Sequence, residues 1–262
     1  MHEQLLRIAS AIGEARRMLI ITGAGLSADS GLPTYRGIGG LYNGHTDEGL
    51  PIEVALSGDM LRSDPALCWK YLAQLGHACL GAQPNEGHRA IAQLQVLKPD
   101  CWVLTQNIDG YHRAAGSPSE RLIEIHGELA PLHCHQCGAA DEQLHEHLRR
   151  VLPPLCGNCG GVLRPPVTLF GEMLPQAAVT RLYAELEKGF DLVMSVGTSA
   201  SFPYIVEPVW RARQSGGVTV EVNLSHTAVS DLVDYRVAER ALDVFPELLS
   251  HINAHNICKW TG

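Results

Sequence analysis

Two Cys-x-x-Cys pairs constrain the fold of this chain more than any other feature of its sequence. Cys134 and Cys137 form the first pair and Cys156 and Cys159 the second, with eighteen residues between the pairs. This spacing is typical of a zinc ribbon, in which four thiolates surround a zinc ion as a tetrahedron. A closed shell of four thiolates leaves zinc no open position for a substrate, so we expect a structural site.

Other ligand sets remain open at this point. His133 and His135 flank the first pair and could serve as alternative ligands, and redox-active or unliganded cysteines are the competing interpretation. The N-terminal segment lacks the apolar core and cleavage site of a secretory signal, so we expect a cytoplasmic location, where clustered thiols are more often metal ligands than disulfides. Four further cysteines have no partner at metal-ligand spacing and are expected to be buried or incidental: Cys68, Cys79, Cys101 and Cys258.

Short apolar runs alternate with helix-like stretches along the rest of the chain. This alternation favours an α/β fold with a doubly wound, parallel, Rossmann-like sheet. The hydrophobic content of 45% and charged content of 18% argue against both disorder and membrane residence. The runs expected to form strands are 18–22, 101–105, 122–125, 191–196 and 218–222, and the stretches expected to form helices are 3–15, 64–80, 85–97, 176–188 and 245–253.

Two segments interrupt this alternation. Residues 36–63 are rich in glycine, proline and polar residues, and residues 127–166 contain both cysteine pairs and two Pro-Pro breaks. We therefore expect one Rossmann-like domain with two insertions. Its parts are 1–37, 89–126 and 167–262, with a loop and helical insertion at 38–88 and a small zinc-ribbon domain at 127–166.

A glycine-rich loop follows the first expected strand. The sequence from Gly23 to Ala28, GAGLSA, fits the G-x-G-x-x-A pattern of dinucleotide-binding loops. Such glycines let the backbone approach a pyrophosphate at the N-terminus of the next helix, although a plain strand-to-helix turn is an equal alternative. Pro33 should end this helix soon after it starts, and Arg36 lies on a loop suited to closure over a cofactor.

Polar side chains follow two later strands. Gln106, Asn107 and Asp109 come directly after one strand, and His126 follows the next. In parallel α/β sheets the ligand lies beyond the carboxyl ends of the strands, so these turns and the glycine loop should meet in one crevice. His126 offers a neutral base near physiological pH, and a purely structural histidine is the competing interpretation.

The ordered set of motifs resembles the sirtuins of the bacterial type, from about residue 18 to residue 248. Sirtuins are NAD-dependent protein lysine deacylases with a Rossmann-like domain and a small zinc-binding domain, so the resemblance implies NAD and zinc as cofactors. The matching segments are GAGLSADSGLPTYRG (23–37), TQNIDGYHRAAG (105–116), HG (126–127), the cysteine pairs, RPPVTLFGEMLP (164–175), GTS (197–199) and VEVN (220–223).

The resemblance also implies roles for individual residues. His126 would be the catalytic base and Asn107 a second catalytic residue; the backbone of Thr168, Leu169, Phe170, Gly171 and Glu172 would pair with an acylated-lysine protein or peptide. The acyl oxygen would attack the ribose as nicotinamide leaves, and His126 would then activate a ribose hydroxyl, giving free lysine and an O-acyl-ADP-ribose. NAD would contact Gly23, Ala24, Gly25, Tyr35, Arg36, Gln106, Asn107, Ile108, Asp109, Gly197, Thr198, Ser199, Asn223, Leu224, Ser225 and Ala241.

Several positions depart from the family pattern. Thr34 and Tyr35 replace the more familiar Asp and Phe, Thr168 replaces a valine, and the stretch from Ala200 to Pro203 is one residue shorter than usual. Sirtuins that prefer acidic acyl groups carry a Tyr-x-x-Arg motif in the helix matching residues 64–80. Leu72 and Leu75 stand at the aligned positions, which predicts a pocket for neutral acyl groups because no cation faces a carboxylate.

Three other functions remain possible from the sequence. NAD-dependent mono-ADP-ribosyl transfer would use the same cofactor pocket. A hydride-transferring dehydrogenase would explain the glycine loop but not the QNID and HG turns, and a zinc-ribbon binding module would need no NAD. The net charge of −8 and the few bases of the ribbon weigh against nucleic acid or a membrane as a partner. We expect a monomer.

Overall fold

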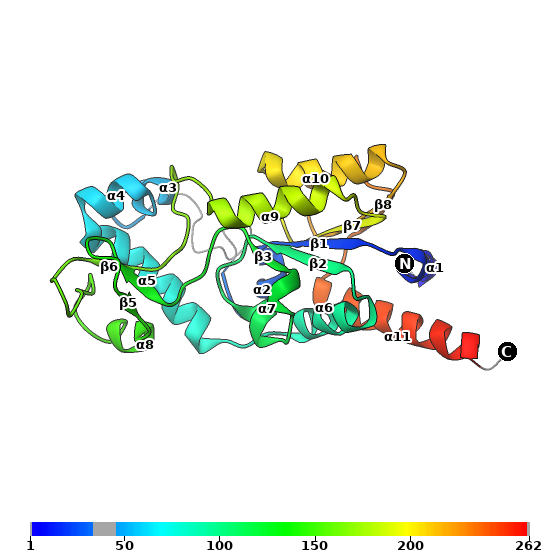
Figure 1. The fold of residues 1–262 in the computed structure, drawn as a ribbon, viewed down its shortest axis with the longest axis horizontal. Helices are drawn as coiled ribbons and strands as arrows, with labels where there is room; N and C mark the ends of the chain where they lie inside the picture. The colour runs from blue at the N-terminus through cyan, green and yellow to red at the C-terminus, as the bar shows by residue number, and fades with distance from the viewer. Residues whose placement is uncertain (1, 34–45, 261–262) are drawn as a thin grey trace.

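The central sheet contains six parallel strands in the part of the chain that the structure describes, residues 2–33 and 46–260 of a computed structural model. Figure 1 shows it in the Rossmann-like lobe. The strand order β3-β2-β1-β7-β8-β9 is that of a dinucleotide-binding fold, which confirms the predicted fold class. The strands are β1 (Met18–Thr22), β2 (Cys101–Thr105), β3 (Leu122–Glu124), β7 (Leu192–Val196), β8 (Val218–Val222) and β9 (Tyr235–Val237).

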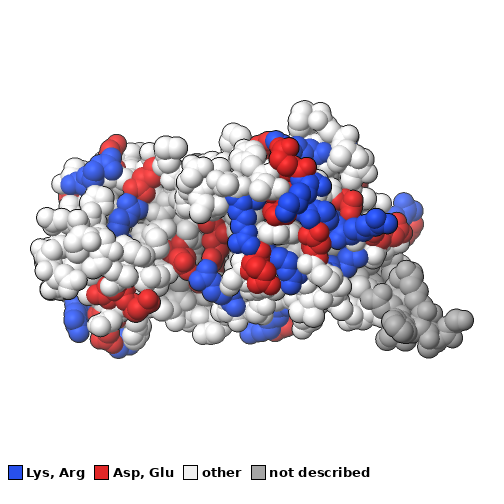
Figure 2. All heavy atoms as spheres, in the orientation of Figure 1, with Lys and Arg blue, Asp and Glu red and all other residues white. Residues whose placement is uncertain are grey.

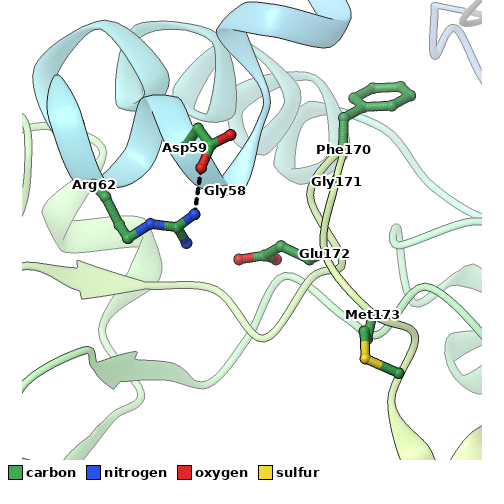
Figure 3. A pocket seen from close by; sticks show the side chains of 7 residues that line it. All are labelled: Gly58, Asp59, Arg62, Phe170, Gly171, Glu172 and Met173. Carbon is green, nitrogen blue, oxygen red and sulfur yellow. Dashed lines mark hydrogen bonds and ion pairs between the residues drawn. The ribbon is translucent and has the colours of Figure 1, made fainter.

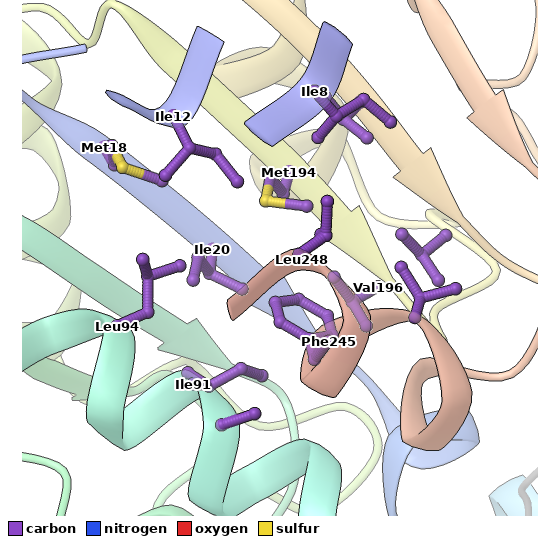
Figure 4. Close-up of a cluster of buried hydrophobic side chains, with 14 of the residues drawn as sticks. Ile8, Ile12, Met18, Ile20, Ile91, Leu94, Met194, Val196, Phe245 and Leu248 are labelled. Atoms are coloured by element: carbon purple, nitrogen blue, oxygen red, sulfur yellow. The ribbon is translucent and has the colours of Figure 1, made fainter. Parts of the chain in front are cut away.

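Helices cover both faces of this sheet. On one face α1 (His2–Glu14), α6 (Glu86–Leu97) and α11 (Ala241–Trp260) enclose an apolar core with the alternate strand residues that point toward them (Figure 4). On the other face α9 (Gln176–Glu187) and α10 (Pro203–Gln214) enclose a second core. Since both faces are covered, the strands read as continuous apolar runs in the sequence.

Local sequence signals set where these helices begin and what they bury. The stripe of Leu5, Ile8 and Ile12 on α1 is fully buried, as its helical spacing predicts. Helix α6 begins after Asn85, whose side chain accepts hydrogen bonds from the backbone N–H groups of Gly87 and His88. The short helix α2 (Ala24–Ala28) ends before Pro33, as expected.

A smaller lobe contains the cysteine pairs. Its sheet has the order β5-β4-β6, from β5 (Ala140–Asp141), β4 (Leu132–Cys134) and β6 (Leu163–Arg164). The two interrupting segments share one apolar core here, in which buried Trp69 donates from Nε1 to the carbonyl of Leu163 over 2.9 Å. The helices of this lobe are α3 (Ile52–Ala55), α4 (Gly58–Ser63), α5 (Pro65–Gly81) and α8 (Leu144–His147).

Some elements were not predicted from the sequence. Helix α10 carries Pro203 at its start and Pro208 inside it, which weakens its helical signal. Strand β9 spans three residues, too short for an apolar run to stand out. The remaining short helical segments are α7 (Tyr111–Ala114) and the 3-10 turn η1 (Ser119–Arg121).

Charges are mixed on the surface. On the face shown in Figure 2, Lys and Arg side chains are interspersed with Asp and Glu, and none of the described helices is long and apolar enough to cross a membrane.

Candidate active site

The register of the sheet brings three loops to one edge. Thr22, the last residue of β1, lies opposite Thr105 on one side and opposite Val196 on the other. The chain leaves all three strands at the same level, so the glycine loop, the turn at 106–110 and the loop at 197–200 start side by side. The sheet register thus brings the glycine loop and the turn at 106–110 to one edge, as predicted, together with the loop that follows β7.

The glycine loop packs directly against the loop that follows β7. The backbone N–H of Gly25 donates to the carbonyl of Gly197 over 2.8 Å. A Cβ on Gly25 would lie 2.8 Å from the Cα of Gly197, and Gly197 itself has a positive φ of 58°. Close contact between two backbones therefore requires glycine at both positions, independently of any bound pyrophosphate.

One hydroxyl joins the glycine loop to the QNID turn. Ser27 Oγ donates to Asp109 Oδ2 over 2.7 Å and accepts from Asn107 Nδ2 over 3.1 Å. Asn107 Nδ2 also donates to the carbonyl of Gly23 over 3.1 Å. Because both partners of Asn107 belong to the glycine loop, its side chain is held in one orientation.

Asp109 and Gln106 are held by further bonds. Burial raises the pKa of Asp109, although the Tyr111 amide and the Ser27 hydroxyl lower it by donating to the carboxylate. Gln106 Nε2 donates to Thr198 Oγ1 over 2.8 Å, and Asn223 Nδ2 donates to the carbonyl of Thr198 over 2.8 Å. The turns after β2, β7 and β8 are thus connected by hydrogen bonds.

His126 is held as a neutral imidazole. Its Nδ1 lies 2.9 Å from the carbonyl of Gln106, which can only accept, so Nδ1 carries the proton and Nε2 the lone pair. Burial lowers the pKa of His126, against the smaller raising effect of that carbonyl. The hydroxyl of Tyr204 lies 2.7 Å from Nε2. The lone pair of Nε2 lets this nitrogen act as a base.

Two more buried histidines support the site and were missed in the sequence. Nε2 of His88 lies 3.3 Å from Ser27 Oγ, and Nε2 of His112 lies 2.8 Å from Thr22 Oγ1. Burial lowers the pKa of His88 to about 4 and that of His112 to about 3, so both are neutral. His88 could have been found from the helix start at 84–88, because its side chain completes the capping box of Asn85.

The other predicted cofactor residues lie around this crevice or outside the described chain. Ile108 packs on the core of the small lobe, Leu224 is 64% exposed, and the Ser225 amide donates to Asn223 Oδ1 over 3.3 Å. Ala241 is the first residue of α11. Tyr35 and Arg36, with the Thr34 departure, fall outside the described residues. Ala24 begins α2, and Ser199 Oγ lies 2.8 Å from Ser201 Oγ.

The four paired cysteines converge. Sγ of Cys134 lies 3.4 Å from Cys159 Sγ, and Sγ of Cys137 lies 3.7 Å from Cys156 Sγ. Zn–S bonds of about 2.3 Å would place tetrahedral sulfurs about 3.8 Å apart, so this set fits zinc. In the described chain the cluster contains the four cysteines and neither His133 nor His135.

Backbone amides prepare these sulfurs for a cation. The pKa of Cys134 is lowered to about 6, chiefly because the Cys137 amide donates to it. The Gly161 amide acts likewise on Cys159, but the neighbouring sulfurs outweigh it and raise its pKa to about 12. A bound divalent cation would remove this conflict by favouring all four thiolates.

The segment 168–172 runs between the two lobes. The Thr168 amide donates to the carbonyl of His126 over 2.8 Å, and the Phe170 amide donates to that of Leu56 over 3.0 Å. Within the segment, Phe170 forms one isolated parallel bridge with Ser57; Val167, just before the segment, forms an isolated antiparallel bridge with Gly127. The side chain of Glu172 is bound by Arg164, at 2.7 and 2.9 Å.

Hollows flank this segment on two sides. One of about 380 Å³ lies between α4 and the segment, with Asp59, Arg62 and Glu172 on its walls (Figure 3). Another of about 260 Å³ lies beside Thr168 and His133. Side chains of an extended peptide could enter hollows of this size.

The two positions aligned with the acidic-acyl motif are buried. Leu72 is 2% and Leu75 8% exposed, both in the core of the small lobe. Nearby Tyr71 donates from its hydroxyl to Glu48 Oε2 over 2.5 Å, and Lys70 is paired with the same carboxylate over 2.6 Å. The Lys70 ammonium of α5 is thus already paired with Glu48.

Comparison with known proteins supports one family. The Sir2 family model matches residues 23–203. The chain is 67% identical over 251 residues to a Pseudomonas aeruginosa protein named NAD-dependent protein deacylase 2, covering 96% of this chain and 98% of that protein. It is 36% identical to a Pyrobaculum aerophilum protein of the same name, covering 94% and 95%.

Comparison with solved structures supports the same family. A Sir2 homologue in complex with NAD superposes with a TM-score of 0.84 at 34% identity, covering 95% of this chain and 94% of that one. A Sir2 complex with a p53 peptide and NAD⁺ gives a TM-score of 0.82 at 27% identity, covering 95% and 98%. The motifs, the strand order, the cysteine cluster and these matches agree that the chain belongs to the Sir2 family.

Proposed function

We propose that this chain is an NAD-dependent protein lysine deacylase that removes neutral acyl groups and releases nicotinamide and an O-acyl-ADP-ribose. The observation that carries the proposal is the neutral His126, with its Nε2 lone pair directed away from Gln106, at the strand edge where Asn107 and Asp109 also lie. The deacylase names of the relatives support the same reaction.

NAD would supply a ribose carbon that accepts the acyl oxygen as nicotinamide leaves. The chain's own residues would prepare that exchange. Asn107, fixed by Ser27 and the carbonyl of Gly23, keeps its Oδ1 available to accept a hydrogen bond in the crevice. His126 Nε2 would then accept the proton of a ribose hydroxyl, which makes that oxygen a nucleophile.

The cofactor would lie across the edge of the sheet. The glycine loop at 23–25 with Tyr35 and Arg36 would hold its phosphates, and Gln106, Ile108 and Asp109 the nicotinamide end. The adenosine end would lie against Gly197, Thr198 and Ser199, the Asn223–Ser225 turn and Ala241, where the hydrogen bonds of Thr198 already connect the loops.

An acylated-lysine peptide would lie along residues 168–172. Since main-chain groups would set the register of the peptide along this segment, we propose low sequence selectivity. Leu72 and Leu75, with the already paired Lys70, support a neutral acyl group such as acetyl or a longer chain. Equal or faster turnover of a succinyl-lysine peptide than of an acetyl-lysine peptide would contradict this assignment.

Zinc held by the four cysteines would be structural, because the tetrahedron leaves no open position. We further propose that the chain divides into a Rossmann-like domain (1–37, 89–126 and 167–262) with insertions at 38–88 and 127–166, and that it is a monomer. We propose a cytoplasmic location, since a thiolate zinc site suits a reducing compartment.

NAD-dependent mono-ADP-ribosyl transfer is the alternative, because it would use the same crevice. Mass analysis of the products separates the two. Incubation with NAD and an acetyl-lysine peptide should give unmodified lysine peptide and an acylated ADP-ribose. ADP-ribose attached to protein, with the acetyl group retained on the peptide, would instead support the alternative.

A further inference from the structure

An aromatic pair borders the ring of His126. Phe202 and Tyr204 stack on each other at 5.3 Å with an interplanar angle of 10°. Each is edge-on to the imidazole, with ring centroids 5.8 Å and 6.0 Å away. Phe202 belongs to the Ala200–Pro203 stretch that departs from the family pattern, and Tyr204 follows it directly. None of the residue roles proposed above uses the pair.

The Tyr204 hydroxyl makes a directed contact rather than simple packing. It lies 2.7 Å from Nε2 of His126, the nitrogen that carries the lone pair. Burial raises the pKa of Tyr204 to about 12, so its phenol is neutral and donates. The hydroxyl is thus the resident hydrogen-bond donor to the atom that would take the ribose proton.

A neutral imidazole nitrogen has a single in-plane lone pair. It cannot accept strong hydrogen bonds from the Tyr204 hydroxyl and from a ribose hydroxyl at the same time. One donor must leave before the other binds. Tyr204 lies in the first turn of α10, six residues beyond Thr198, so the segment that carries it starts at a loop assigned to the cofactor.

We propose that Tyr204 is a positioning residue that occupies the base nitrogen of His126 in the resting enzyme and must yield it to the ribose hydroxyl. The identity of the incoming hydroxyl rests on the proposed function. The contact between Tyr204 and His126 in the resting enzyme does not depend on it. The hydrogen bond from Tyr204 keeps the His126 imidazole neutral and oriented. The ribose hydroxyl must break this bond in every reaction cycle before it can bind Nε2.

The substitution Tyr204→Phe removes the hydroxyl and keeps the ring. In the ligand-free protein, the pKa of His126 followed by NMR should rise by about half to one unit, because one neutral donor to Nε2 is lost. With NAD and an acetyl-lysine peptide above that pKa, kcat/KM should rise about fivefold, the worth of one ordinary hydrogen bond. The acidic limb of its pH profile should move with the pKa.

Tyr183→Phe is the matched control, because Tyr183 is an exposed tyrosine whose hydroxyl donates to Glu207 on α10 rather than to His126. Tyr183→Phe should change neither the pKa of His126 nor kcat/KM. If Tyr204→Phe does not fold, as judged by near-ultraviolet circular dichroism, Tyr204→Leu removes the hydroxyl together with the ring, and Phe202→Leu, which keeps the hydroxyl but loses the stacking, is compared with it.

An unchanged His126 pKa in Tyr204→Phe would overturn the resting contact. A raised pKa with unchanged kcat/KM would overturn the competition, and a large loss of kcat would mean that the hydroxyl takes part in the reaction. The NMR measurement needs no turnover. If wild type shows no NAD-dependent deacylation, the proposed function fails while the resting contact can still be tested.

Discussion

Ser27 Oγ donates to Asp109 Oδ2 over 2.7 Å, which ties the glycine loop of the cofactor crevice to the turn after β2. The same hydroxyl lies within hydrogen-bond distance of Asn107 Nδ2 and His88 Nε2. One donor and two acceptor sites satisfy all three contacts, the full capacity of a serine hydroxyl. One hydroxyl therefore holds the glycine loop, the turn after β2 and the start of α6 together.

Replacing Ser27 by alanine should destabilise the protein and slow the reaction. Asp109, Asn107 and His88 would each lose a buried partner, so the free energy of unfolding should fall by about 1–3 kcal/mol. Urea unfolding measures the stability loss and nicotinamide release the activity. Ser10→Ala, which removes only an exposed bond to Glu14, is the control and should cost less than about 0.5 kcal/mol. Equal effects of the two substitutions would contradict the role of Ser27.

Gly25→Ala and Gly13→Ala should have opposite effects. A Cβ at Gly25 would meet the backbone of Gly197 at 2.8 Å, so the two loops must separate. At Gly13, inside α1, nothing lies within 4 Å, and alanine should stabilise the helix by about 0.5–1 kcal/mol. Thermal unfolding should give a lower midpoint for the first and a higher midpoint for the second. A stable, fully active Gly25→Ala protein would show that the loops are not closely packed.

Acid should destabilise the fold through its buried histidines. In the folded state burial lowers the pKa of His88 to about 4 and of His112 to about 3, below the unfolded value of about 6.5. Between about pH 4 and 6.5 the unfolded chain binds more protons, so stability is complete above about pH 7 and is lost as the pH falls.

Each of these histidines should contribute up to about 1.4 kcal/mol per pH unit in that window. The raised pKa of the Asp109 carboxyl, caused by burial, acts in the opposite direction and reduces the net slope. Urea unfolding of wild type and His112→Gln at several pH values between 7.5 and 5 measures how steeply the free energy of unfolding depends on pH. The variant should show a flatter dependence, and an identical slope would refute this origin.

Removal of zinc should loosen the small lobe rather than stop the chemistry directly. The cysteines hold strands whose residues share one core with Trp69 on α5. A strong chelator should therefore lower the unfolding midpoint and weaken substrate binding. By metal analysis Cys156→Ser should retain less than one zinc per chain, while Cys79→Ala, outside the cluster, should retain one. Full zinc content in Cys156→Ser would contradict the four-thiolate site.

The sequence predicted the features that depend on local patterns. Apolar runs predicted β1 and β2 at their observed bounds. The strand-end rule predicted that polar side chains meet at one edge, where Asn107 contacts the glycine loop and His126 contacts the turn after β2. The cysteine spacing predicted the cluster for the same reason, since Cys-x-x-Cys turns place both sulfurs on one side.

Features that depend on contacts between distant segments could not be read in the same way. Ser27 belongs to the quoted glycine motif, but its three partners come from two other segments of the chain. Tyr204 meets His126 across 78 positions, and Pro203 and Pro208 concealed the helix that carries it. The shared core of the two interrupting segments likewise exists only after folding.

Nicotinamide release from NAD, measured with and without an acetyl-lysine peptide in wild type and His126→Ala, tests the central claim most directly. We predict that the peptide strongly stimulates release in wild type, and that His126→Ala forms acylated ADP-ribose at least about a hundredfold more slowly, because it lacks the base. Release that needs no peptide, or product formation that is unaffected by His126→Ala, would contradict the account.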